Sequence, residues 1–262
     1  MVSLRRIALV IAGLSTVSVA YLFPPYSVRN EGVPVGVLKN VNGIDMYHSY
    51  PPGRNTSHKA ILHITDIFGV PLLQNKLLAD SFAANDYLVI MPDIFAGDAI
   101  SVEQQEAGLN LTEWRTRHPP AAIDAIISQT LAYMRTELGV EYVGGVGYCF
   151  GGKYVPRFLT ASASAGLDMG FIAHPSALTE AEIGAVEKPI SIAAGTLDAS
   201  FNTTAKVRAE GILKANNVTF QSNLYSGAPH GFGVRVNQDV PQQAYAKQAS
   251  FIQAVTWFGA WL

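Results

Sequence analysis

Residues 142–152 read Tyr-Val-Gly-Gly-Val-Gly-Tyr-Cys-Phe-Gly-Gly, and this stretch bears most directly on the fold. Its first seven residues are apolar or small, as in a buried strand, and a helical pattern follows Gly152. Cys149 stands at the corner between the two. A sharp strand-to-helix turn strains its corner residue and needs glycine wherever neighbouring side chains would collide. The segment therefore predicts a nucleophile elbow, a turn that raises a reactive side chain above a sheet.

Outward from this turn, short apolar runs alternate with helical patterns along the chain. We expect strands at Ala60 to Thr65, Tyr87 to Pro92, Tyr142 to Tyr148, Met169 to His174, Ile190 to Ala194 and Thr219 to Tyr225. We expect helices at Leu72 to Ala84, Ala121 to Leu138, Gly152 to Thr160, Thr204 to Asn216 and Pro241 to Leu262. This alternation predicts a mostly parallel, doubly wound sheet flanked by helices.

Two segments fall outside that alternation. The turn Asn42-Gly43, inside Val35 to Tyr47, predicts an antiparallel hairpin at the sheet edge. Residues 95–118 fit neither the helical nor the strand pattern, and they are a candidate lid or substrate loop.

Two polar residues at strand ends complete a catalytic pattern. Asp198 lies just past the strand at Ile190 to Ala194, and His230 lies beyond the strand at Thr219 to Tyr225. Open α/β sheets place their sites at the carboxyl ends of strands. The order nucleophile, acid, histidine is that of α/β hydrolases. We therefore predict an α/β-hydrolase fold with Cys149, Asp198 and His230 as its triad.

An oxyanion hole requires two backbone N–H donors near the nucleophile. One normally follows the nucleophile, at a helix N-terminus that also favours a thiolate, and the other comes from the loop after an early strand. That loop is Thr65 to Val70 here. The amides of Ile67 and Phe150 are the candidates.

Five short motifs together resemble the dienelactone hydrolases, notably the fungal members of that family. They are Gly-Tyr-Cys-Phe-Gly-Gly at 147–152, Asp66-Ile67-Phe68-Gly69, Met91-Pro92-Asp93, Gly195-Thr196-Leu197-Asp198 and His230-Gly231-Phe232. The resemblance covers roughly residues 35–262. It implies the same triad and oxyanion donors, a small ester or lactone substrate, and no metal or organic cofactor.

The same resemblance implies roles for two charged residues. Asp66 stands where the family usually has a glutamate that interacts with the resting thiol, but its side chain is shorter. Arg235 lies near the position of an arginine that binds the substrate carboxylate, with one extra residue between it and the histidine. The ordinary alternatives are a helix cap for Asp66 and a solvated surface charge for Arg235. Trp114 and Tyr148 either line the pocket or pack in the core.

The function expected from these residues is hydrolysis of a lactone or small carboxylic ester through a thioester acyl-enzyme. Thioesterase or aryl-esterase activity is an alternative, as is a non-catalytic binding protein with the same fold. A dinucleotide-binding loop is a further rival, because Gly145 to Gly151 contains part of that fingerprint. Phe150, however, stands where the third glycine belongs, and Asp168 precedes the next strand instead of ending it.

Composition narrows the possible partners. The 262-residue chain is 49% hydrophobic with a net charge of −2, which suits a large core and offers no field to attract nucleic acid. Its single cysteine excludes an intrachain disulfide and any zinc framework built on cysteine pairs.

The N-terminal 25 residues have the character of a targeting segment, and the catalytic domain is expected at 26–262. Two arginines precede the uncharged run Ile7 to Phe23, which is followed by Pro24-Pro25. This pattern predicts a secretory signal cleaved after Ala20, or a retained membrane anchor, with a packed first helix as the alternative. Sequons at Asn55, Asn110, Asn202 and Asn217 agree with a secreted glycoprotein.

Overall fold

A computed structural model describes residues 26–161 and 166–262. The expected signal or anchor segment therefore lies outside the described residues. Among the helices of the described part, none has the length and apolar character needed to cross a bilayer.

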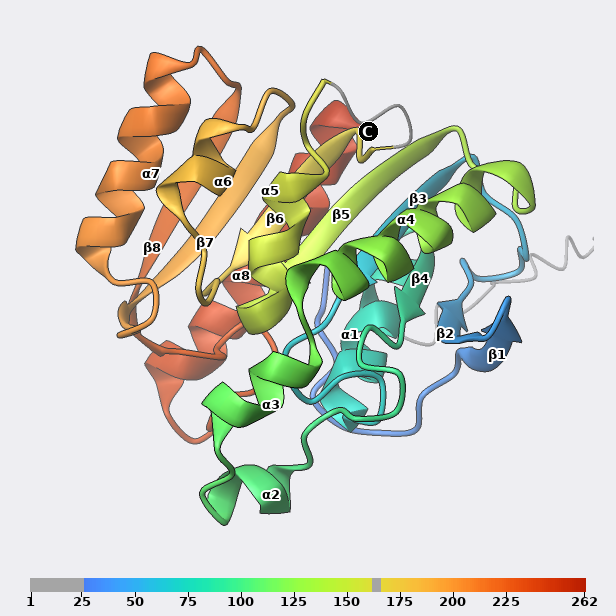
Figure 1. Ribbon diagram of the computed structural model, residues 1–262, viewed down its shortest axis with the longest axis horizontal. Coiled ribbons are helices and arrows are strands. Elements are labelled where there is room, and N and C mark those ends of the chain that lie inside the picture. The colour runs from blue at the N-terminus through green and yellow to red at the C-terminus, as the bar shows by residue number, and fades with distance from the viewer. Residues whose placement is uncertain (1–25, 162–165) are drawn as a thin grey trace, which may run out of the picture.

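One eight-stranded sheet forms the middle layer of the molecule (Figure 1). Its spatial order is β1-β2-β4-β3-β5-β6-β7-β8, with β3 to β8 parallel and the hairpin β1–β2 joined antiparallel at one edge. The strands are β1 Val37–Val41, β2 Ile44–Ser49, β3 Lys59–Ile64, β4 Leu88–Pro92, β5 Tyr142–Tyr148, β6 Met169–Ala173, β7 Ile190–Leu197 and β8 Phe220–Pro229. This arrangement confirms the predicted fold class and the edge hairpin.

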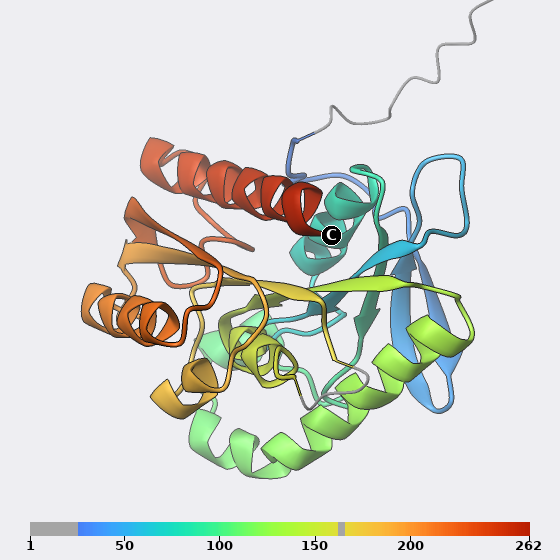
Figure 2. The ribbon, with the colours of Figure 1, turned by 90° about the horizontal axis from the view of Figure 1, so that it is seen from above.

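Helices cover both faces of the sheet (Figure 2). On one face lie α1 Leu73–Ala83 and α8 Pro241–Trp261, and on the other lie α4 Pro120–Thr136, α5 Tyr154–Arg157, α6 Glu180–Gly184 and α7 Thr203–Ala215. Each face has its own apolar core. Because both faces are covered, a central strand such as β4 is buried along its whole length.

Residues 95–118 form a structured insertion between β4 and α4. Two short helices, α2 Val102–Glu106 and α3 Leu111–Arg117, occupy half of it. Ser101 and Gln104 close a capping box on α2, and the Asn110 side chain accepts the Thr112 and Glu113 amides at the start of α3. Both helices are too short for a hydrophobic period to reveal them.

The prediction of one helix from Gly152 to Thr160 is wrong. The chain instead forms a 3₁₀ turn, η1 Cys149–Lys153, followed by the four-residue α5. In an α-helix, residue 156 would donate a hydrogen bond to the carbonyl of residue 152, and Pro156 has no N–H to donate. The helix α6 was not expected, although Thr179 and Glu182 form the capping box that signals it.

Candidate active site

Cys149 occupies a sharp corner between β5 and η1. Its φ of 51° lies in the left-handed region that costs energy for any residue with a Cβ. The corner is also crowded, since a Cβ on Gly147 would lie 2.5 Å from the Gly151 carbonyl oxygen. A Cβ on Gly151 would lie 2.2 Å from the carbonyl oxygen of Ile64 in β3. The glycines are therefore required by close backbone approach, as the elbow pattern predicts.

The pairing of β7 with β8 brings an acid and a base together. Both strands run further than expected, and Leu197 pairs with Pro229 after an irregularity at Gly195. Asp198 directly follows Leu197, and His230 directly follows Pro229. The pairing of the two strand ends therefore makes Asp198 and His230 neighbours. Glycine is needed at 195 because a Cβ there would lie 2.3 Å from the Ala228 carbonyl oxygen.

The three side chains form one hydrogen-bonded row. His230 Nδ1 lies 3.0 Å from Asp198 Oδ1, and His230 Nε2 lies 3.0 Å from Cys149 Sγ. The Asp198 carboxylate is buried and also accepts the amides of Ser200 and Phe201 at 2.8 and 3.1 Å. An ionised carboxylate only accepts, so Nδ1 carries the proton of that bond and Nε2 faces the sulfur.

The surroundings of His230 favour its protonated form. Burial alone would lower the pKa of His230, but hydrogen bonds and charge from Asp198 and Cys149 outweigh burial and raise the pKa to about 10. Burial pushes the pKa of Asp198 upward, yet the bonds from His230 and the two amides leave the pKa below its usual value. The two partners of His230 in the row therefore stabilise a positive charge on its imidazole.

The two candidate oxyanion donors lie on segments that are bonded to each other. Gly151 N–H in the elbow donates to the carbonyl of Thr65 at 3.0 Å, which ties η1 to the loop after β3. Phe150 directly follows Cys149 at the start of η1, where a helical N–H has no partner inside its own helix. Ile67 is two residues beyond Thr65 in the bonded loop.

Comparison with known proteins agrees with this arrangement. The dienelactone hydrolase family profile matches residues 44–262. The chain belongs to that family. Its members hydrolyse esters and lactones, so this chain is a hydrolase with a small-molecule substrate. The family and the enzyme class expected from the sequence are confirmed.

Two fungal relatives and one solved structure show the extent of the similarity. Hydrolase pyvD of Aspergillus violaceofuscus is 43% identical over 89% of this chain and 93% of its own length. Hydrolase tropI of Talaromyces stipitatus is 38% identical over the same two shares. The dienelactone hydrolase of Anabaena variabilis is 14% identical, with a TM-score of 0.61 over 87% of this chain and 99% of that one, and shows the shared fold.

Asp66 is held by hydrogen bonds from two neighbouring residues. Its carboxylate accepts the Phe68 amide at 3.1 Å and the Asn75 side-chain amide at 2.9 Å, and it is only 2% exposed. Burial raises the pKa of Asp66, while the Asn75 bond and the charge of Arg235 act in the opposite direction. Asp66 does not cap α1, whose N-cap is Leu72 without a side-chain bond, so the helix-cap alternative is wrong.

Arg235 is a half-buried residue of the same neighbourhood. Its guanidinium lies 3.9 Å from the centre of the Phe68 ring, a cation–π contact, and its Nε is buried without a hydrogen-bond partner among the described residues. This placement rules out the fully solvated charge. The expected contact with a substrate carboxylate stays a prediction.

Tyr148 and Trp114 lie inside the protein, each 1% exposed. The Tyr148 ring packs between His63 and His174, with ring centres 5.4 and 5.9 Å away. Trp114 packs against the ring of Phe150, with centres 5.7 Å apart. Both residues thus have the packing role that was the alternative to lining the pocket.

The structure adds neighbours that the sequence pattern did not assign. Ser176 Oγ lies 3.8 Å from Cys149 Sγ, and the Ser176 amide donates to the Cys149 carbonyl at 2.9 Å. Its position just beyond β6, at the active edge of the sheet, was the available signal. Asn75 gave no signal, because its contact with Asp66 depends on how α1 packs. Within residues 26–161 and 166–262, no group of three or more His, Cys, Asp or Glu side chains is placed to hold a metal ion.

Proposed function

We propose that this hydrolase uses Cys149 as its nucleophile and cleaves small lactones or carboxylic esters through a thioester. The distance of 3.0 Å between Cys149 Sγ and His230 Nε2, at a residue held with φ of 51°, is the observation that carries the proposal. A buried cysteine without catalytic use needs neither the strained backbone nor a histidine anchored by a carboxylate.

Acylation begins with the thiol proton on His230 Nε2. The sulfur attacks the ester carbonyl carbon, and the carbonyl oxygen becomes an oxyanion between the Ile67 and Phe150 amides. When the tetrahedral intermediate collapses, the C–O bond to the leaving alcohol breaks and His230 protonates that oxygen. In a lactone the alcohol stays attached to the acyl group.

Deacylation reverses the roles of the same groups. His230, now neutral, removes a proton from water as the water oxygen attacks the thioester carbonyl. The second tetrahedral intermediate expels the sulfur, and the acid product leaves. Throughout, Asp198 holds the imidazole in the tautomer that presents Nε2 to the sulfur and stabilises its positive charge.

The test is turnover by Cys149→Ala with small lactones, activated aryl esters and thioesters as separate substrates. Removing a nucleophile costs on the order of 10⁶-fold in kcat where nucleophile and base act as a unit. We expect no turnover above background at an unchanged melting temperature. Full activity in this variant contradicts the proposal. The substrate panel applied to the wild type distinguishes lactonase from aryl-esterase or thioesterase activity.

A further inference from the structure

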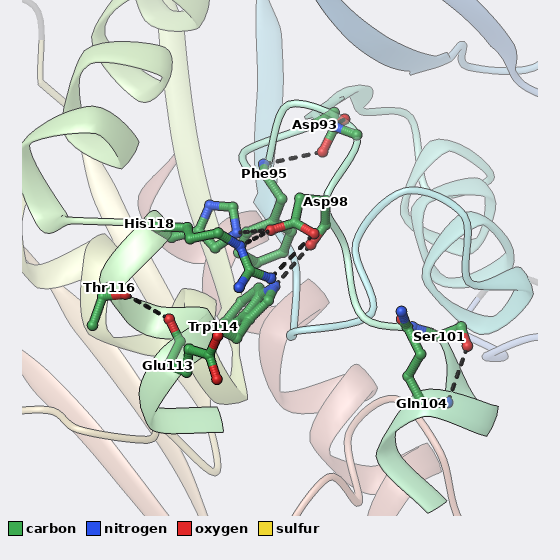
Figure 3. Close-up of polar contacts among 11 residues, drawn as sticks. Asp93, Phe95, Asp98, Ser101, Gln104, Glu113, Trp114, Thr116 and His118 are labelled. Atoms are coloured by element: carbon green, nitrogen blue, oxygen red, sulfur yellow. Dashed lines mark hydrogen bonds and ion pairs between the residues drawn. The ribbon is translucent and has the colours of Figure 1, made fainter. Parts of the chain in front are cut away.

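The insertion at residues 95–118, a candidate lid on sequence grounds, contacts both segments that carry the candidate oxyanion donors. Just before it, Asp93 accepts the Phe95 amide at 3.0 Å and the Gly97 amide at 2.7 Å, which forms a tight turn after β4. At its end, α3 presents Trp114 to the interior. Figure 3 shows Trp114 and His118 directed toward the Asp98 segment between these two points.

One contact of the insertion reaches the first oxyanion donor. The N–H of Ile100 donates to the carbonyl of Ile67 at 3.0 Å. The preceding peptide, which carries the Ile67 N–H, is fixed at its other end because the Asp66 carbonyl accepts the Gly69 amide at 3.1 Å. The Ile67 donor is therefore restrained on one side by its own turn and on the other by the insertion.

A second contact reaches the other donor. The ring of Phe150 lies 5.2 Å from Phe95 and 5.7 Å from Trp114, measured between ring centres, and all three side chains are buried. Because the Phe150 side chain and amide belong to one residue, the packing of its ring limits how that N–H can rotate. The same insertion thus restrains both donors.

Trp114 joins these two contacts. Its indole N–H donates to the carbonyl of Asp98 at 2.8 Å, two residues before Ile100, while its ring contacts Phe150. The Asp98 carboxylate in turn binds Arg117 Nε and His118 Nε2, both at 2.9 Å, which closes α3 onto the segment it supports.

We propose that Trp114 is a positioning residue that sets the separation of the Ile67 and Phe150 amides. The proposal rests on the proposed function, because it assumes that those two amides stabilise the oxyanion. The proposal predicts that substitution of Trp114 slows only the steps that form a tetrahedral oxyanion. We expect the nucleophilicity of the Cys149 thiol to stay unchanged, because it depends on His230.

The experiment compares two substitutions at Trp114 with one control. Trp114→Phe keeps a ring against Phe150 and loses the bond to Asp98, whereas Trp114→Leu loses both. Trp257→Leu in α8 is the matched control, since Trp257 is buried in the core on the opposite face of the sheet. For each protein, kcat and KM on an activated ester, the rate of Cys149 alkylation by iodoacetamide, and the affinity for a trifluoromethyl ketone are measured.

Trp114→Leu is expected to lower kcat, counted per alkylatable thiol, by about 10- to 100-fold, because a displaced donor loses part of the 10²- to 10³-fold that one donor contributes. Affinity for the ketone, whose adduct carries the oxyanion, falls in parallel, while KM and the alkylation rate stay near wild type. Trp114→Phe shows a smaller loss of the same kind. Trp257→Leu lowers the melting temperature without these changes.

Unchanged kcat per thiol in both Trp114 variants overturns the inference, and so does an equal fall in alkylation and turnover. Counting per alkylatable thiol removes any unfolded fraction, and Trp114→Phe decides the matter should Trp114→Leu fail to fold. Failure of the proposed function has a different signature, because wild-type turnover would then survive Cys149→Ala whatever the Trp114 variants do.

Discussion

The loops after β6 and after β8 each place a histidine at the same edge of the sheet, with opposite results. The rings of His174 and His230 lie 5.3 Å apart at centre. His230 has a carboxylate on one nitrogen and a sulfur on the other, and its pKa is raised to about 10. His174 is fully buried with no hydrogen-bond partner on either nitrogen in the described part of the chain, and burial lowers its pKa to about 3.

This contrast shows that partners, and not burial alone, decide the charge of a histidine. The His174 ring is fully buried and the His230 ring is partly buried, and in both cases burial disfavours the imidazolium. Only His230 has a buried carboxylate within bonding distance to compensate. His63 behaves like His174, since it is buried without a partner and burial lowers its pKa to about 3. Near the carboxyl ends of the strands, the charged form is therefore favoured for His230 and the neutral form for His63 and His174.

The largest effect is expected from removing the partner that distinguishes His230. Asp198→Asn takes away the carboxylate and allows the wrong tautomer, so kcat should fall by about 10⁴-fold. The pKa of His230, followed by NMR, should drop toward its ordinary value or below it. Asp168→Asn is the control, because Asp168 bonds Arg135 at 3.0 Å at the opposite end of β6. A kcat within tenfold of wild type would contradict the assigned role of Asp198.

The free energy of unfolding below about pH 6.5 should depend on the two buried histidines, His63 and His174. Their pKa is lower in the folded than in the unfolded state, so between about pH 6.5 and 3 only the unfolded chain takes up their protons, and stability falls as pH falls. Each such histidine adds about 1.4 kcal/mol per pH unit to that slope. We expect His174→Phe to reduce the slope by that amount in urea unfolding between pH 4.5 and 6, and His63→Phe to do the same. Unchanged slopes would show that the rings are protonated in the folded state.

Above about pH 6.5, the free energy of unfolding should show an effect of opposite sign, which comes from His230. Its pKa is raised by folding, so its contribution is fully present below about pH 6.5 and is lost as pH rises toward 10. The test compares Cys149→Ser with Cys149→Ser/His230→Gln, so that the thiol is absent from both proteins. Only the first protein should lose stability as pH rises above about 6.5. The pH range of that loss should be narrower than in the wild type, because the charge of Cys149 is absent from both variants and the His230 side chain is 32% exposed. Parallel curves would show that Asp198 alone does not hold the charge.

Much of the site could be predicted because its signals are local. The glycines around Cys149 and the apolar strand before it identify the elbow within a few residues, and Asp198 and His230 follow apolar strands in the expected order. The closeness of Asp198 and His230 could not be predicted, because it comes from the pairing of Leu197 with Pro229 across two strands. The bond between Asn75 and Asp66 likewise depends on how a distant helix packs.

The errors in the fold have equally specific causes. Pro156 interrupts the hydrogen bonding of a helix that the apolar pattern alone extends to residue 160. In the insertion, α2 and α3 span five and seven residues. Helices of this length are too short for a hydrophobic period to be recognised in the sequence. Trp114 carries no sign in the sequence that it contacts Phe150, because 36 positions separate them and only the folded chain brings them together.

Under the proposed function, the positive φ of Cys149 places catalysis and stability in opposition at a single position. Glycine is the one residue that adopts this conformation without steric cost, so it would relax the turn while removing the reactive sulfur. Selection for stability alone would thus favour the loss of this cysteine, and only selection for turnover retains it. In descendants released from that selection, the strained corner is where we expect the ancestral chemistry to disappear first, with the rest of the sheet preserved.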